Sequence, residues 1–496
     1  MSDFQTKIKK SLLSGAIWQG LQTGVQDLVI FLLGVVLARL LTPEDFGIYA
    51  IILFFVSVFE VFSEGGMGVA LVRKQHIDRF DCSAVLLYNV GIGLVCISVL
   101  WIAAPWIGAF YKMPESVWLL RILSLKILID AVRTVSFARL RRELQFKKLA
   151  ILRISATAAG GTTGLVMALA GCGVWSFVGQ QLISAIVMTG LCLLWMPWKM
   201  TLQSKMQNFK ELFSFGGGLL AINVLNRAMN NLYTLIIGKA YSADALGFYN
   251  RAQALQGIPV RLGQTIIGEA GGTVLYRLQG DDRILQQHLF QLLQMTGFLF
   301  FPILFGLAAS AEPAIVFLLG EKWIASAQYL PILCSMGIFL EINYFAHMLY
   351  KVKGKVRILF WSETAVRGSM LLFAVICFCL KGDILWLLWS GVAAYGIGYL
   401  YDCLMCGKML DFGFMKRIYL LWKILLCNGL MYFVLQMTWQ YLLRDIPAFF
   451  ALMILVAEGV TIYWLTSHLL NAPGYREGIN FLKQKAGFCK KTRSIS

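Results

Sequence analysis

Apolar runs long enough to cross a bilayer recur along the chain from residue 16 to residue 470, separated by short polar segments. A transmembrane α-helix needs about 20 consecutive apolar residues. The pattern therefore predicts an all-α integral membrane protein with about fourteen transmembrane helices. The predicted helices cover residues 14–41, 47–72, 84–111, 117–137, 150–170, 174–197, 211–240, 247–276, 285–310, 326–349, 358–380, 384–407, 418–440 and 447–470.

The amino-acid composition excludes a soluble globular protein. Of the 496 residues, 58% are hydrophobic and 14% are charged, against about 45–50% and about 25% in soluble domains. The loops between the predicted helices are short, and the longest covers residues 138–153. We therefore expect no catalytic domain outside the membrane and no enzymatic activity.

The positions of the basic residues predict how the chain is oriented. With the N-terminus inside, thirty Lys and Arg residues lie in cytoplasmic segments and seven in external ones. Cytoplasmic loops carry the excess of basic residues in membrane proteins, so both termini are expected to be cytoplasmic. The net charge of +18 does not indicate nucleic-acid binding, because the basic residues are spread over many small loops. We expect no nucleic acid as a partner, and membrane lipids against the basic tail.

A segment near the start of the second predicted helix recurs 200 residues later. Residues 41–49 have the sequence LTPEDFGIY, and residues 241–249 have the sequence YSADALGFY. In each copy a hydroxyl residue, Thr42 or Ser242, is placed to cap a helix whose first turn contains acids. Six predicted helices per copy make the two repeats parallel. We expect two six-helix lobes around a central cleft, residues 1–200 and 201–410, then a helix pair at 411–471 and a basic cytoplasmic tail at 472–496.

Three predicted helices carry a stripe of polar residues along one face. Polar groups inside a bilayer are costly unless they face a cavity or a partner. The stripes therefore favour a water-lined cleft, and the alternative is hydrogen bonding between packed helices. The stripes are Gly15, Gln19, Gln22, Thr23 and Gln26; Gly216, Asn223, Asn226, Arg227 and Asn230; and Asn250, Gln253, Gly257, Arg261, Gln264 and Gly268.

The predicted helix at 117–137 adds Arg121, Lys126, Asp130 and Arg133. Asp130 is four residues from Lys126 and three from Arg133, so these charges can pair with one another. Arginines in a cleft favour an anion, above all a pyrophosphate, because the guanidinium fork matches phosphate oxygens. The substrate-binding candidates are Arg121, Arg133, Arg227, Arg261, Gln26, Asn223, Asn226 and Gln264.

Several acids also lie within predicted helices. They are candidates for proton or sodium sites, or they pair with the arginines, and both interpretations stay open. The candidates for ion coupling are Asp27, Glu60, Glu64 and Glu269. No metal site or cofactor is predicted, because the four His residues are widely spaced and the pair Cys403 and Cys406 lies in an apolar segment.

The sequence resembles the bacterial polysaccharide exporters, the O-antigen, colanic-acid and teichuronic-acid type flippases of the multidrug/oligosaccharidyl-lipid/polysaccharide exporter superfamily. The segments that carry the resemblance are SGAIW at 14–18, LARLLTPEDFG at 37–47 and GEKW at 320–323. The resemblance implies fourteen helices in the bacterial cytoplasmic membrane and translocation of undecaprenyl-pyrophosphate-linked oligosaccharide repeat units. It also implies the lipid-linked oligosaccharide as substrate and a polysaccharide polymerase and chain-length machinery as partners.

Three other functions remain as alternatives. A cation-coupled drug or metabolite antiporter of the same superfamily would usually have twelve helices and a cleft with more acids than arginines. A membrane glycosyltransferase or polymerase would need a large external loop with catalytic acids, which the short loops do not provide. A scaffolding membrane protein would not need arginine stripes inside the bilayer.

Overall fold

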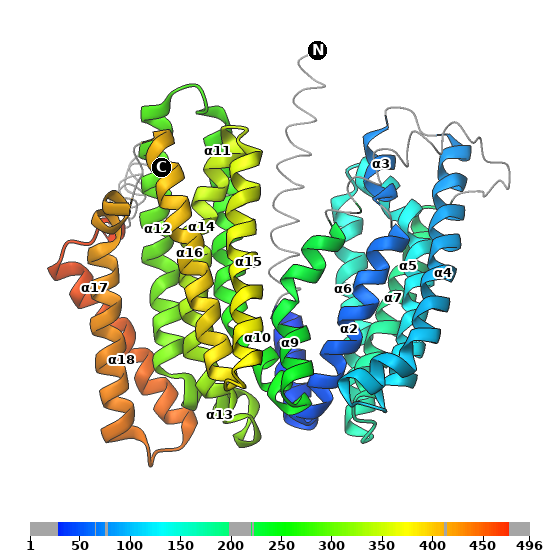
Figure 1. The fold of residues 1–496 in the computed structure, drawn as a ribbon, viewed down its shortest axis with the longest axis horizontal. Coiled ribbons are helices and arrows are strands. Elements are labelled where there is room, and N and C mark those ends of the chain that lie inside the picture. The colour runs from blue at the N-terminus through cyan, green and yellow to red at the C-terminus, as the bar shows by residue number, and fades with distance from the viewer. Residues whose placement is uncertain are drawn as a thin grey trace, which may run out of the picture. The chain divides into compact units, whose positions relative to one another are not determined.

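The computed structural model describes residues 28–64, 66–74, 78–197, 220, 223–410 and 414–475, and only the backbone at positions 73, 79, 269, 270, 273, 414, 416 and 418. All regular elements in these ranges are helices (Figure 1). A helix over Leu28–Leu40 precedes α2 (Pro43–Glu64), α3 (Met67–Arg73), α4 (Arg79–Tyr111), α5 (Ser116–Arg142), α6 (Phe146–Leu169), α7 (Trp175–Trp195), α9 (Leu232–Ala240), α10 (Ala243–Thr265), η1 (Ile266–Gly271), α11 (Gly272–Arg277), α12 (Asp282–Ala309), α13 (Ala311–Leu319), η2 (Glu321–Trp323), α14 (Ser326–Val352), α15 (Val356–Cys379), α16 (Ile384–Leu410), α17 (Phe414–Thr438), η3 (Trp439–Leu443) and α18 (Ala448–Leu469).

Ten helices of the described part are long and apolar enough to cross a membrane. They correspond to ten of the predicted spans, and the prediction of an all-helical integral membrane protein is confirmed. The other four predicted spans are those that carry the polar stripes and the charges of residues 121–133. Two of these, α5 and α10, are long helices that contain several charged or amide side chains, which lowers their hydropathy.

The loop predicted at residues 138–153 is wrong. Helix α5 continues to Arg142 and α6 begins at Phe146, so only residues 143–145 connect the two helices. Arg139, Arg141 and Arg142 lie in the last turn of α5, where basic residues are favourable because the carbonyl end of a helix is negative. Hydropathy alone does not distinguish a charged loop from the charged end of a helix.

The two copies of the repeat begin their helices in the same way, as predicted. In the first copy, the backbone N–H of Asp45 donates to Thr42 Oγ1 at 3.2 Å, and the backbone N–H of Thr42 donates to Asp45 Oδ2 at 2.8 Å. In the second, the backbone N–H of Ala245 donates to Ser242 Oγ at 3.1 Å. These caps satisfy N–H groups that have no partner within the helix.

The same two helix starts approach each other closely at a pair of glycines. A Cβ atom added to Gly47 would lie 1.9 Å from the carbonyl oxygen of Ala243, and one added to Gly247 would lie 1.9 Å from the carbonyl oxygen of Pro43. The two contacts are reciprocal, since each is the other shifted by 200 residues. Only glycine permits backbones to approach this closely.

The chain divides into two compact units, residues 1–247 and 248–496. In the first unit α5 packs against α4 and α7, and α6 packs along α7. In the second unit α12, α14, α16 and α17 contribute to a cluster of buried residues that includes Leu289, Phe345 and Leu421. The lobe boundaries at 200 and 410 stay predictions, because residues 198–219 and 411–413 lie outside the described ranges.

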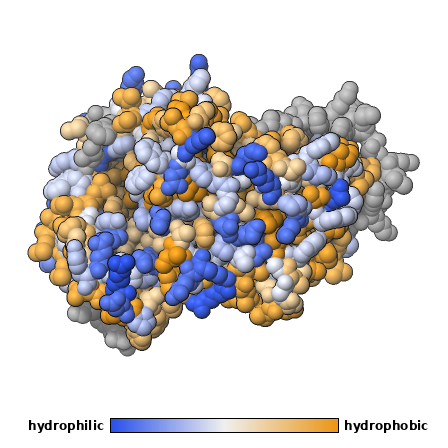
Figure 2. Space-filling model, turned by 60° about the horizontal axis from the view of Figure 1, so that its bottom comes forward, coloured by the Kyte–Doolittle hydropathy of each residue, from blue (hydrophilic) through white to orange (hydrophobic). Residues whose placement is uncertain are grey.

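Large hydrophobic side chains lie on the surface of the spanning helices. Trp106 on α4, Leu194 on α7 and Trp386 on α16 are 70%, 75% and 75% exposed. Figure 2 shows extensive hydrophobic areas, in orange, next to groups of hydrophilic residues on the face that is turned forward. Such an apolar surface requires a lipid environment, because soluble proteins rarely expose large apolar patches.

Candidate functional site

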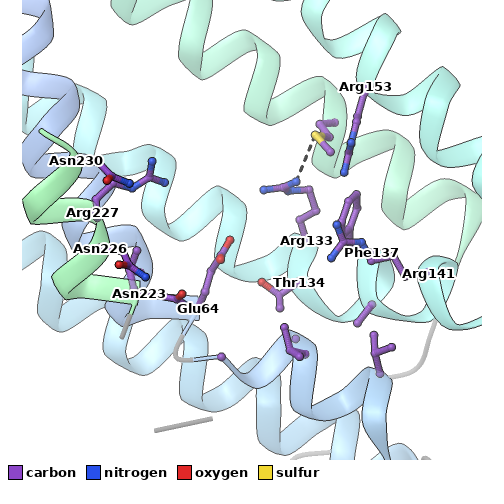
Figure 3. A pocket seen from close by; sticks show the side chains of 17 residues that line it. Glu64, Arg133, Thr134, Phe137, Arg141, Arg153, Asn223, Asn226, Arg227 and Asn230 are labelled. Carbon is purple, nitrogen blue, oxygen red and sulfur yellow. Dashed lines mark hydrogen bonds between the residues drawn. The ribbon is translucent and has the colours of Figure 1, made fainter. Parts of the chain in front are cut away.

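The first unit contains a cavity of about 630 Å³ (Figure 3). Its walls come from the end of α2, from α3, from the second half of α5, from the start of α6, from α7 and from the helical residues 223–230. Its polar and charged side chains are Glu64, Arg133, Thr134, Arg141, Arg153, Asn223, Asn226, Arg227 and Asn230.

One of the predicted polar stripes lines this cavity. Asn223, Asn226, Arg227 and Asn230 have the spacing of one helix face, and all four belong to the cavity wall. Figure 3 shows them on one side and the labelled side chains of α5 on the other, with Glu64 next to Asn223. The structure thus brings together several of the predicted binding residues, including Arg133 and Arg227, and the predicted ion-coupling candidate Glu64.

Three arginines surround the ring of Phe137 on the opposite wall. The guanidinium carbons of Arg133, Arg141 and Arg153 lie 5.4, 5.0 and 5.7 Å from its ring centroid. An aromatic face carries negative charge density and therefore attracts cations. The ring thus brings three positive charges together in one wall of the cavity. Arg133 Nη1 also donates a hydrogen bond to Met188 Sδ at 3.3 Å.

Arg141 and Arg153 were not predicted as site residues, because both fall in the segment assigned to a cytoplasmic loop. A signal existed in the sequence: Arg133, Phe137 and Arg141 are spaced four residues apart and share one face of a helix that continues to Arg142. The contribution of Arg153 comes from α6 and depends on how the two helices pack.

Arg133 is also the end of a chain of charges in which Asp130 is buried and the other three side chains are half-buried. Lys126 Nζ lies 2.5 Å from Glu60 Oε1 and 2.6 Å from Asp130 Oδ2, and Arg133 Nη2 lies 2.9 Å from Asp130 Oδ1. The predicted pairing of Asp130 with Lys126 and Arg133 is confirmed. Glu60, which lies on α2, ties that helix to α5. Two acids and two bases balance in this chain.

The cavity itself has an excess of positive charge. Four arginines line it against one acid, Glu64. Within the described residues, no ion pair joins Arg141, Arg153 or Arg227 to a carboxylate. These three guanidinium groups, together with the amide side chains of the same cavity, suit an anion with several oxygen atoms.

Arg121 lies away from this cavity, although it was predicted to bind substrate with Arg133. Its Nε and Nη2 atoms donate to the carbonyl oxygen of Trp101 at 3.3 Å, and its guanidinium lies 5.0 Å from the ring of Trp118. Arg133 follows Arg121 by twelve positions, which corresponds to about 18 Å along a helix. Of these two arginines, α5 brings only Arg133 to the cavity.

The remaining predicted site residues either belong to the second unit or lie outside the residues that the structure describes. Arg261 and Gln264 belong to α10 in the second unit, where Arg261 is exposed and Gln264 is half-buried. Gln26 and Asp27 lie outside the described residues, and so does the side chain of Glu269. The roles assigned to these five residues stay predictions.

No group of three or more His, Cys, Asp and Glu residues suited to hold a metal ion occurs in the described ranges. Cys403 and Cys406 are buried free thiols on α16, and Tyr350 Oη lies 3.6 Å from Cys406 Sγ. The pair packs within the second unit.

The chain is similar in sequence to several known bacterial proteins. The chain is 28% identical over 331 residues to the succinoglycan biosynthesis transport protein ExoT of Rhizobium meliloti (strain 1021), covering 66% of each chain. It is 24% identical over 363 residues to the lipopolysaccharide biosynthesis protein WzxC of Escherichia coli (strain K12), covering 71% of this chain and 72% of that protein. The teichuronic acid biosynthesis protein TuaB of Bacillus subtilis (strain 168) is 23% identical, with 77% and 79% covered.

Solved structures share the fold. The lipid II flippase MurJ in an inward closed conformation matches with a TM-score of 0.74 at 19% identity, covering 93% of this chain and 99% of that one. An inward-facing multidrug resistance MATE family transporter of the MOP superfamily matches with a TM-score of 0.60 at 16% identity, covering 78% and 95%. The family model described as polysaccharide biosynthesis protein matches residues 36–328. Because this match covers more than half of the chain, the chain belongs to the polysaccharide biosynthesis protein family.

Proposed function

We propose that this chain is a flippase of the bacterial cytoplasmic membrane that translocates undecaprenyl-pyrophosphate-linked oligosaccharide repeat units. The product would supply lipopolysaccharide, capsule or exopolysaccharide biosynthesis. The protein would act as a transporter and not as an enzyme, in keeping with its family and with relatives named as transport and biosynthesis proteins.

The observation that carries this proposal is the arginine-rich cavity. In the orientation predicted from the loop charges, the ends of α2 and α5 and the start of α6 are cytoplasmic, so the cavity lies toward the side where a newly made substrate is available. A pyrophosphate entering it exchanges hydration for the guanidinium groups of Arg141, Arg153 and Arg227. Asn223 and Asn226 add amide groups that can bond to phosphate or sugar oxygens.

The rest of the predicted architecture belongs to the same proposal. Fourteen helices in two parallel lobes, with both termini cytoplasmic, would let the cavity face either side of the membrane in turn. The membrane potential then assists export, because moving one negative charge outward across about 100 mV yields about 2.3 kcal/mol. A polysaccharide polymerase and chain-length machinery would receive the substrate on the external side.

The test is transport of a fluorescent undecaprenyl-pyrophosphate-linked oligosaccharide in proteoliposomes, measured by the fraction that an external quencher reaches. A charged hydrogen bond contributes about 1.5–3 kcal/mol. We therefore expect the double variant Arg153→Gln/Arg227→Gln to lower the transport rate at subsaturating substrate by at least about 10-fold.

The matched control is Arg357→Gln, which removes an exposed arginine outside the cavity and should leave transport unchanged. Equal rates in the wild-type protein and the double variant would refute the assignment of this cavity to the substrate.

The alternative function is that of a drug or metabolite antiporter. It rests on the likeness to the multidrug transporter, which concerns the fold alone. Transport of cationic drugs by the reconstituted protein would favour this alternative.

A further inference from the structure

The second unit contains another cavity of about 630 Å³, which the proposed transport site does not include. It lies among the end of α12, α13, the start of α14 and the end of α17 with η3. These segments are helix ends, and α13 is labelled at the bottom of Figure 1. In the orientation predicted from the loop charges, this end of the helices is external.

Three glutamine side chains line this cavity. Gln328 and Gln440 are exposed, and their side-chain amides make no hydrogen bond with any residue that the structure describes. Gln436 Nε2 donates to the carbonyl oxygen of Ala309 at 3.3 Å, which orients the amide and leaves its oxygen for a ligand. An amide group both donates and accepts hydrogen bonds, as a hydroxyl group does. Three amides around one cavity therefore suit a ligand with several hydroxyl groups.

Two aromatic residues complete the wall. Trp439 Nε1 donates a hydrogen bond to Glu312 Oε2 at 3.3 Å. This bond holds the indole ring of Trp439, in η3, against α13. Tyr441 is 78% exposed. Aromatic side chains offer an apolar face next to a polar edge, which matches the C–H face and the hydroxyl edge of a sugar ring.

The charge of this cavity differs from that of the first one. Its lining contains one acid, Glu312, and one base, Arg444, so the two charges balance. A phosphate group would find no excess of positive charge here. Ala308, Ala309, Ala311 and Ala327 leave room between the helices, and the volume falls within the range of sites for small molecules.

The backbone of the cavity wall departs from α-helical geometry. Residues Trp439–Leu443 form the π-helical turn η3 at the end of α17. A π-helical turn contains more residues than an α-helical turn, and such turns often occur at functional sites. This turn lets Trp439, Tyr441 and Arg444 line the cavity together with Gln436 and Gln440.

We propose that this cavity is a carbohydrate-binding site for neutral sugar residues on the external side of the membrane. The inference rests on the proposed function, because the exported oligosaccharide is the carbohydrate that reaches this side. The site would hold the glycan after translocation and so disfavour its return.

The test uses the full-length protein in detergent, fluorescently labelled, on an array of neutral oligosaccharides that represent bacterial polysaccharide repeat units. The wild-type protein should be retained on at least one class of neutral glycan. A neutral hydrogen bond contributes a factor of about 2 to 12 in affinity, so Gln328→Ala/Gln440→Ala should weaken retention by about 10-fold. Both glutamines are exposed, so the variant should fold. Trp439→Leu should also weaken retention.

Two controls make the outcome specific. Gln287→Ala changes an exposed glutamine outside the cavity and should bind the array as the wild-type protein does. Arg153→Gln/Arg227→Gln should keep array binding while it loses transport. A wild-type protein that transports lipid-linked oligosaccharide but binds no glycan, or a glutamine double variant that binds as strongly as the wild-type protein, would overturn the site. Array binding without transport would instead refute the proposed function.

Discussion

The reciprocal contact of Gly47 and Gly247 predicts what a single methyl group would do to the crossing of α2 and α10. In Gly47→Ala the new Cβ would lie 1.9 Å from the carbonyl oxygen of Ala243, whereas ordinary Cβ contacts begin at 3.4 Å. The two helix starts would have to separate by the difference. Overpacking of this kind costs about 1–3 kcal/mol, and the helix propensity of alanine offsets about 0.5–1 kcal/mol. We expect a net loss of up to about 2.5 kcal/mol.

The matched control is Gly190→Ala on α7, where an added Cβ has no neighbour within 4 Å. That variant should be about 0.5–1 kcal/mol more stable than the wild-type protein, because alanine favours the helix. The assay is thermal denaturation in one detergent, followed by the fraction that remains monodisperse. Gly47→Ala should denature at a lower temperature than the wild-type protein, and Gly190→Ala at a similar or higher one.

A double variant tests whether the two glycines form one contact. Gly47→Ala and Gly247→Ala force the same separation, so their combined effect should be smaller than the sum of the single effects. Gly47→Ala with the stability of Gly190→Ala would show that the helix starts do not approach as described.

Three further predictions concern the first unit. Lys126→Met leaves the acids Glu60 and Asp130 without their shared base. Breaking a buried pair costs about 3–5 kcal/mol, and because this chain is half-buried we expect a loss of stability up to that size in the same thermal assay. Adding Glu60→Gln should restore part of the loss, and a fully stable single variant would contradict the ion chain. Phe137→Leu removes the ring that three arginines contact, and each contact contributes about 0.5–1 kcal/mol. The transport rate at low substrate concentration should therefore fall several-fold. An unchanged rate would count against a role of the three arginines around Phe137. Glu64→Gln removes the one acid that lines the cavity. It should lower the substrate concentration for half-maximal transport, because the carboxylate repels an anionic substrate. A higher concentration would contradict an anionic substrate in this cavity.

Much of the candidate site could be predicted from local patterns in the sequence. The positions of Asn223, Asn226, Arg227 and Asn230 on one helix face follow from helical periodicity, and the structure shows that this face lines a cavity. The pairing of Asp130 with its neighbours on α5 also follows from helical spacing. Such features depend on residues three to seven positions apart, so the helix geometry alone determines them.

Other features depended on how distant segments meet. Arg121 and Arg133 look alike in the sequence, but only Arg133 reaches the cavity. Arg153 joins it because α6 returns beside α5 after a three-residue connection, where hydropathy indicated a long loop.

The sequence alone therefore determined that the chain is helical and membrane-spanning, which faces of its helices are polar, and how the two repeats cap their helices. The tertiary structure decided which of those faces share a cavity and at what height along each helix, because helix packing depends on contacts between residues far apart in the chain. The approach of Gly47 to Ala243 is such a contact, since neither residue's local sequence specifies its partner.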